Sequence, residues 1–67
     1  MGHEINARMW VLQDGVQREL VTYFADEEDD IEALPTFPAI AAASVALVIG
    51  TGKVYALTRD GWNPIGG

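Results

Sequence analysis

The dipeptide Asp14-Gly15 constrains the fold of this chain most strongly, because it stands between two apolar segments. Asp-Gly readily supplies the two consecutive positive φ angles that a tight two-residue β-turn needs. The segment before it, Ala7–Leu12, is apolar and aromatic, and the segment after it, Val16–Phe24, has the alternation of a half-buried strand. The sequence therefore predicts an N-terminal β-hairpin formed by Ala7–Leu12 and Val16–Phe24.

An acidic segment follows the hairpin, with six carboxylates in the seven positions 26–32. Asp26 is a good helix N-cap, and negative charge in a first turn complements the helix dipole. Pro35 disfavours helical geometry at Leu34 and ends the helix there. Ile31 and Leu34, three residues apart, would anchor one side of it. These features predict a short acidic helix from Asp26 to Leu34.

The C-terminal half carries three further strand signals. Val45–Ile49 is a β-branched run that a glycine-rich turn follows, Lys53–Thr58 is the second strand, and Trp62–Ile65 is the third. Pro64 cannot donate to a central ladder, which places the third strand at an edge. The predicted fold is α+β and mostly β, with an N-terminal hairpin, a short acidic helix and a C-terminal three-stranded antiparallel meander.

Length and cysteine content limit how stable such a fold can be. The chain has 67 residues and no cysteine, so it is expected to form a single small domain over 1–67, with 1–6 as a flexible N-terminal arm. A core of this size typically supplies only about 3–5 kcal/mol, and oligomerisation commonly compensates. The sequence of Ala39–Ser44 is compatible with a helix, a strand or a loop.

Charge and hydropathy exclude two classes of partner. The net charge is −6, and the four basic residues are scattered, whereas nucleic acid binding needs clustered Lys and Arg. The longest apolar stretch, Ala39–Gly50, is too short for a membrane-spanning helix, which needs about 20 residues. We therefore expect a soluble protein, made in the cytoplasm, that binds neither nucleic acid nor membrane.

The chain lacks the residues of the common catalytic and metal sites. Nucleophilic catalysis would require the single serine, Ser44, to meet the single histidine, His3, near the N-terminus. The acidic segment lacks the central glycine of a calcium loop. Gly50–Lys53 lacks the preceding glycine and the following Ser or Thr of a phosphate-binding loop. We expect no enzymatic activity, no metal and no cofactor.

Aromatic and apolar side chains on the strands are the candidates for protein contacts. Each aromatic residue could fill the small core or anchor an interface, and both interpretations remain open. So small a domain cannot enclose all of them, and Trp10 is the one we expect to be exposed. The predicted partner-binding residues are Trp10, Val21, Tyr23, Tyr55 and Trp62.

Seven short segments carry a resemblance to a known group of proteins. They are Leu20–Asp26, Leu34–Thr36, Ser44–Ala46, Val48–Ile49, Gly50–Gly52, Val54–Leu57 and Gly61-Trp62. In these segments the chain resembles small structural proteins of tailed bacteriophages, of the capsid-decoration, head-fibre or head-neck type. It has Ala43-Ser44 where Gly-Ser is expected before the third strand. The resemblance implies a non-enzymatic virion protein, made in the host cytoplasm, that binds the major capsid protein or other virion proteins in multiple copies or as a homo-oligomer.

The C-terminal Gly66-Gly67 supports an alternative function. β-grasp sulfur carriers and ubiquitin-like modifiers also begin with a hairpin that leads into a helix and also end in Gly-Gly. In such a protein Gly67 would be adenylated and converted to a thiocarboxylate. The acidic segment is shorter and more charged than the helix that those proteins use, so the virion interpretation is preferred.

Overall fold

The computed structural model describes residues 2–65. It is mostly β, as predicted, with a single 3₁₀ helix and five strands in one sheet. The elements, in chain order, are β1 (His3–Gln13), β2 (Val16–Ala25), η1 (Glu28–Ala33), β3 (Val45–Val48), β4 (Val54–Thr58) and β5 (Gly61–Pro64).

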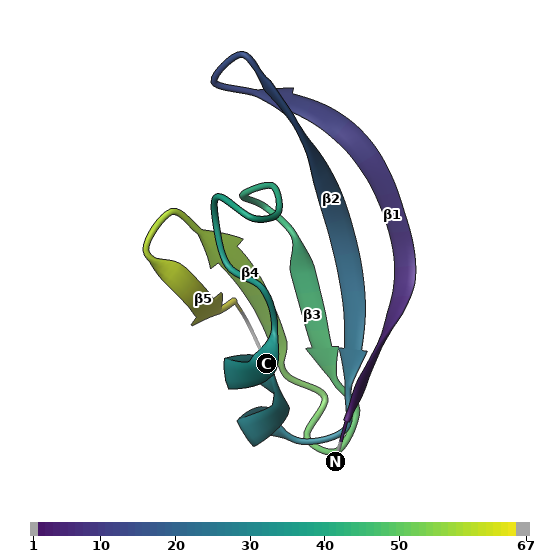
Figure 1. Ribbon diagram of the computed structural model, residues 1–67. Helices are drawn as coiled ribbons and strands as arrows, with labels where there is room; N and C mark the ends of the chain where they lie inside the picture. The colour runs from purple at the N-terminus through teal and green to yellow at the C-terminus, as the bar shows by residue number, and fades with distance from the viewer. Residues whose placement is uncertain (1, 66–67) are drawn as a thin grey trace.

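The five strands lie in the sheet in the same order as in the chain (Figure 1). The N-terminal hairpin β1–β2 and the meander β3–β4–β5 are antiparallel, as the sequence predicts. The two halves are joined by a parallel pairing of β2 with β3, in which Thr22 lies opposite Val45 and Ala25 opposite Val48. The sheet is therefore mixed, which the sequence analysis did not foresee.

The hairpin turn has the expected geometry, but β1 begins earlier than predicted. Asp14 and Gly15 have φ angles of 55° and 76°, as the tight turn requires. The prediction of a flexible arm over 1–6 differs from the structure, because β1 starts at His3, which lies opposite Ala25. The His3 ring packs edge-on against Tyr23 at 5.8 Å between centroids, a contact that holds this end of β1 on the sheet. Met1 lies outside the described residues.

The acidic helix is shorter than predicted and its first turn is different. It is a 3₁₀ helix over Glu28–Ala33 with Glu27 at the N-cap, so the predicted N-cap at Asp26 is wrong. The physical reason is that Asp26 belongs to the strand ends: its N–H donates to Gly2 O at 2.9 Å, and its carbonyl accepts from Gly50 N at 3.2 Å. The backbone can turn into a helix only after these bonds.

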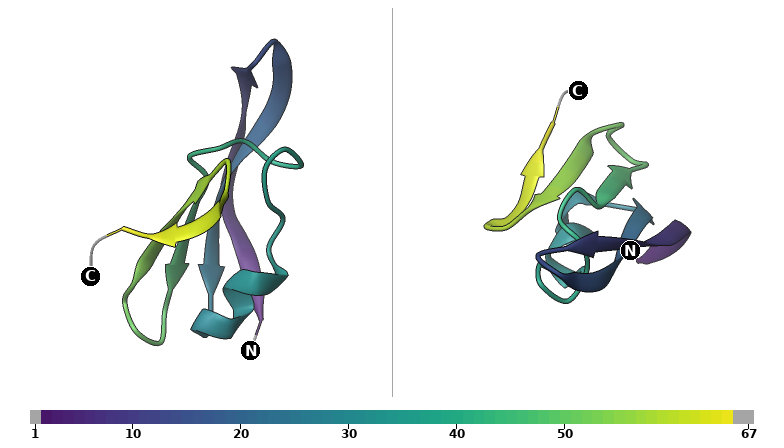
Figure 2. Two further views of the ribbon diagram at one scale, coloured as in Figure 1. Left: turned by 90° about the vertical axis from the view of Figure 1, so that its left-hand side faces the viewer. Right: turned by 90° about the horizontal axis from the view of Figure 1, so that it is seen from above.

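The core lies on one face of the sheet, beneath η1 and the chain that follows it (Figure 2). Ile31 and Leu34 are buried there, as predicted, at 5% and 4% exposure. Three partly buried aromatic residues, Phe37, Tyr55 and Trp62, pack around the buried cluster. The buried apolar side chains of the cluster are Val21, Tyr23, Ala25, Ile31, Leu34, Ile40, Ala46, Val48 and Leu57.

The segment Ala39–Ser44, left open by the sequence, forms irregular turns. It ends at Ser44, which is fully buried and lies at the start of the parallel pairing. The Ser44 hydroxyl donates to Ala41 O at 2.7 Å and accepts from Val21 N at 3.1 Å. The Ser44 side chain therefore provides a hydrogen-bond partner for the Val21 amide, which lies just before the part of β2 that pairs with β3.

Ala43 occupies a backbone conformation that suits glycine. Its φ is 78°, and a residue with a Cβ pays about 1–2 kcal/mol in the left-handed region. Ala43 is exposed, so loss of its methyl group removes no core contact. We expect Ala43→Gly to raise the free energy of unfolding by roughly 0.5–1 kcal/mol, because the strain that it relieves exceeds the entropy that glycine adds to the unfolded chain. Urea denaturation followed by circular dichroism checks this, and an equal or lower midpoint would contradict it.

Candidate interaction surface

The largest exposed apolar side chains gather on β1. Trp10 and Leu12 are 65% and 70% exposed, Met9 is 59% exposed and Ile5 is 47% exposed. Ile5, Trp10 and Leu12 share one face of the sheet, where exposed apolar side chains mark an interaction site, whereas Met9, opposite Leu20, lies on the other face. We call these four residues the β1 strip. The exposure expected for Trp10 is present, and its role in binding stays a prediction.

The hairpin that carries the β1 strip is held firmly at its turn, although it extends beyond the meander (Figure 1). The Gln13 side-chain amide bonds twice to the backbone of Ala42: Nε2 donates to the carbonyl and Oε1 accepts from the N–H, both at 2.9 Å. Asp14 forms an ion pair with Arg59 at 2.7 Å. Ala42 lies in the segment before β3, and Arg59 lies in the turn between β4 and β5. The tip of the hairpin is therefore bonded to two other parts of the fold, which fixes the position of the β1 strip.

A second clamp lies around Phe37. The guanidinium groups of Arg18 and Arg59 lie 4.7 and 4.6 Å from the centroid of its ring, within cation–π range. Arg18 Nε also donates to Pro38 O at 3.1 Å. Two of the four basic residues therefore fix the hairpin to the segment after η1 and do not form a basic patch.

The outer edge of β1 is open, because β1 is the first strand of the sheet and no described segment pairs with its outer side. Natural edge strands are usually short or carry Pro, charged side chains or bulges, which discourage pairing; in β1 the charges are Glu4 and Arg8. The other edge strand, β5, is four residues long and contains Pro64. β1 is 11 residues long and has neither Pro nor Lys; its one irregularity is a bulge between Ile5 and Ala7.

Two of the predicted partner-binding residues are placed elsewhere. Val21 and Tyr23 are only 3% and 4% exposed and belong to the core, so the prediction that they form a contact surface is corrected. Burial also raises the pKa of the Tyr23 hydroxyl, and the nearby Glu19 carboxylate adds to this. Both sides of β2 carry apolar residues, and the sequence did not indicate which side faces inward.

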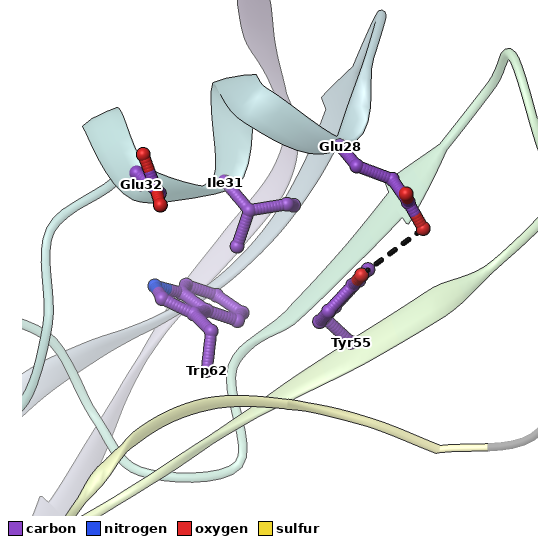
Figure 3. A pocket seen from close by; sticks show the side chains of 5 residues that line it. All are labelled: Glu28, Ile31, Glu32, Tyr55 and Trp62. Carbon is purple, nitrogen blue, oxygen red and sulfur yellow. Dashed lines mark hydrogen bonds between the residues drawn. The ribbon is translucent and has the colours of Figure 1, made fainter.

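Tyr55 and Trp62 meet in a shallow pocket between η1 and the strands β4 and β5 (Figure 3). The pocket has a volume of about 330 Å³ and is completed by Glu28, Ile31 and Glu32. Trp62 Nε1 donates to Pro35 O at 3.0 Å, which fixes the indole ring. The structure therefore groups Tyr55 with Trp62 and places Trp10 at the opposite edge of the sheet.

Glu28 is the charged centre of this pocket. Its Oε1 accepts from Lys53 Nζ at 3.0 Å and from the Tyr55 hydroxyl at 3.2 Å. The hydrogen bond from Lys53, with that from Tyr55, lowers the pKa of the Glu28 carboxyl. Desolvation, together with the bond to Glu28, raises the pKa of Tyr55. Because Lys53 neutralises Glu28 within the chain, this carboxylate has a structural role in joining η1 to β4.

Asp30, Ser44 and His3 also have structural partners. Asp30 Oδ2 accepts from Gly2 N at 2.9 Å and from Glu27 N at 3.0 Å, and the bond from Gly2 lowers the pKa of the Asp30 carboxyl. The Ser44 hydroxyl is occupied by the backbone, and His3 packs on Tyr23. Within residues 2–65, no three His, Asp or Glu side chains converge as a metal site would need.

Three members of the β1 strip, namely Ile5, Met9 and Leu12, were not among the predicted partner-binding residues. A signal for them was present, because Ala7–Leu12 does not alternate: five of its six residues are apolar, whereas a half-buried strand needs a polar side. Such a run fits a strand covered on both faces. In β1 neither face is covered over Met9 and Trp10.

Comparisons with known proteins add no assignment to this surface. No helix among the described residues has the length and apolar character of a membrane span. Comparison of the chain with protein-family models, with curated proteins and with solved structures finds no match.

Proposed function

We propose that this protein is a non-enzymatic structural subunit of a bacteriophage particle, present in multiple copies and bound to the major capsid protein or another virion protein. The proposal rests on the resemblance of its sequence to small virion proteins. The resembling segments lie in β2 and from the end of η1 to β5, so they include most of the core and leave β1 outside. In this proposal the shared part is the scaffold, and β1 is the part that meets the partner.

The observation that carries the proposal is the β1 strip on a hairpin fixed by Gln13 and Asp14. A rigid surface loses little conformational entropy on binding, so more of the interaction energy remains as affinity. Trp is the residue most enriched among interface hot spots. A contact centred on Trp10 fits a protein that works by attachment.

The test is attachment to particles of the encoding phage that were assembled without this protein. Particles are incubated with purified protein and separated on a glycerol gradient, and bound copies are counted. We expect Trp10→Ala to weaken attachment at least about tenfold, as loss of a hot-spot side chain does. Its thermal unfolding should change little, because Trp10 is exposed.

The matched control is Ile49→Ala, which alters another exposed apolar side chain, 58% accessible, outside the hairpin. It should attach like the unaltered protein. A deletion of Gly66 and Gly67 should attach equally well, since the alternative carrier function alone depends on them. Failure of the unaltered protein to sediment with particles would refute the proposal, and normal attachment of Trp10→Ala would remove Trp10 from the interface.

A further inference from the structure

We infer that β1 pairs antiparallel with β1 of a second copy of this chain, which joins two five-stranded sheets into one of ten strands. The inference deepens the proposed function, because it assigns the contact between copies to a defined edge of the sheet. The partner surface is the same on both copies, so the interface has two-fold symmetry and closes as a dimer.

The two edge strands of the sheet differ in length and composition. β5 is short and contains Pro64, whereas β1 offers a long row of unpaired backbone groups. Its middle part, from Ala7 to Gln13, pairs with β2 without a register shift and is therefore a regular template. Pairing along this part would satisfy outward N–H and C=O groups and cover one flank of the exposed Met9 and Trp10 side chains, while the sheet faces that carry them stay open to a virion protein.

The charge of the chain is unevenly distributed. Two copies of so acidic a chain repel each other least at the hairpin, where the charges are nearly balanced. Residues 3–25 carry three carboxylates and two guanidinium groups, whereas residues 26–32 carry six carboxylates and no cation. The acidic segment lies next to the N-terminal end of β1, where His3 pairs with Ala25. Antiparallel pairing points these two ends away from each other, so the acidic segments stand at opposite ends of the joined sheet.

The side chains along β1 select the register. A pairing centred on Arg8 would place two guanidinium groups side by side, which is unfavourable. A pairing centred on Met9 instead places Arg8 of each copy opposite Trp10 of the other. Each guanidinium, which pairs with Glu19 of its own chain at 3.5 Å, would then also lie beside the indole ring of the other copy. The Met9-centred pairing also sets Ala7 opposite Val11 and Met9 opposite Met9, which are apolar pairs. We therefore assign the two-fold axis to Met9.

Sedimentation equilibrium of the purified full chain tests the association. We expect a dimer at about 0.1 mM protein, where mass action populates complexes with Kd values of tens of micromolar. Trp10→Lys should be a monomer at the same concentration, with Kd raised at least about 100-fold, because each new ammonium would face Arg8 of the other copy. Ile49→Lys is the matched control, introducing the same charge at a similarly exposed apolar position, and should remain dimeric.

Circular dichroism should show that both variants are folded, because both side chains are exposed in the single chain. A monomeric unaltered protein at 0.1 mM, a dimeric Trp10→Lys or a monomeric Ile49→Lys would each overturn the inference.

Disulfide formation tests the register, and the absence of native cysteine makes it clean. In the Met9-centred pairing, Met9→Cys brings two thiols directly opposite each other, with Cα atoms about 4.5–5.5 Å apart. Val11→Cys places its two thiols four residues apart along the strands, roughly 14 Å at 3.4 Å per residue, beyond disulfide reach. Rapid oxidation of Met9→Cys alone to a covalent dimer supports the register. Equal or faster cross-linking of Val11→Cys overturns it.

These measurements use the purified protein alone, so they fail independently of particle attachment. A monomer that still attaches through Trp10 would leave the proposed function standing and remove the dimer. A dimer that does not attach to particles would do the reverse.

Discussion

Ser44→Ala is expected to lower the free energy of unfolding by about 1–3 kcal/mol, because the buried Val21 N–H loses its partner, while Ala41 O keeps only its bond from the Ser44 backbone N–H at 3.3 Å. The hydroxyl bonds to Val21 N at 3.1 Å and Ala41 O at 2.7 Å, and Ser44 is completely buried. The loss is a large part of the total of about 3–5 kcal/mol that a core of this size supplies. Urea denaturation followed by circular dichroism should show a much lower midpoint and a partly unfolded population in water.

Thr36→Ala removes a hydroxyl from an exposed position nearby in the chain and serves as the control for Ser44→Ala. Its unfolding free energy should stay within about 0.5 kcal/mol of the unaltered protein, as is usual for surface substitutions. If Ser44→Ala were no more destabilising than Thr36→Ala, the buried bonds of Ser44 would not stabilise the junction of β2 with β3.

Tyr23→Ala is expected to unfold most of the protein at 25 °C. Truncation of a buried aromatic side chain costs about 3–5 kcal/mol, which equals the stability expected for the whole domain. Tyr23 is 4% exposed and contacts the rings of both His3 and Trp62, at 5.8 and 6.2 Å between centroids. It therefore links β1 to β5 across the core. Far-ultraviolet circular dichroism and the dispersion of amide proton resonances measure the folded fraction.

Tyr23→Phe keeps the ring and distinguishes the core role of Tyr23 from a contact role. It should remain folded, since the two ring contacts persist and only the hydroxyl is lost. Trp10→Ala should likewise remain folded, because Trp10 is exposed. A Tyr23→Ala protein that is folded but fails to attach to particles would restore Tyr23 as a contact residue and contradict the assignment made from its burial.

The local features of this fold could be predicted from short stretches of sequence, because each depends on the backbone preferences of neighbouring residues. Asp14-Gly15 specifies the hairpin turn through two positive φ angles. Pro35 ends the helical segment through its steric effect on the residue before it. The glycine-containing turns on either side of Val54–Thr58 delimit the meander strands in the same way.

The exposed site was predicted in part. Exposure of at least one aromatic side chain followed from the limited core of a 67-residue chain, and Trp10, the one we expected, is exposed. The inward side of β2 could not be read in the same way, because Leu20 and Phe24 on one side compete with Val21 and Tyr23 on the other. Burial of Val21 and Tyr23 depends on the position of Ile31 and Leu34, which pack against that side only in the folded chain.

The remaining features depend on residues distant in the chain, and no local pattern encodes them. The parallel pairing of β2 with β3 places Thr22 opposite Val45, and the Val21 amide just before it donates to the Ser44 hydroxyl. Asp26 lost its predicted place as helix N-cap because Gly2 and Gly50 bond to its backbone. Hairpins and turns can therefore be predicted from the sequence, because they depend on neighbouring residues. Strand order, the buried side of β2 and the free edge of β1 depend on which distant segments pack together in the folded chain.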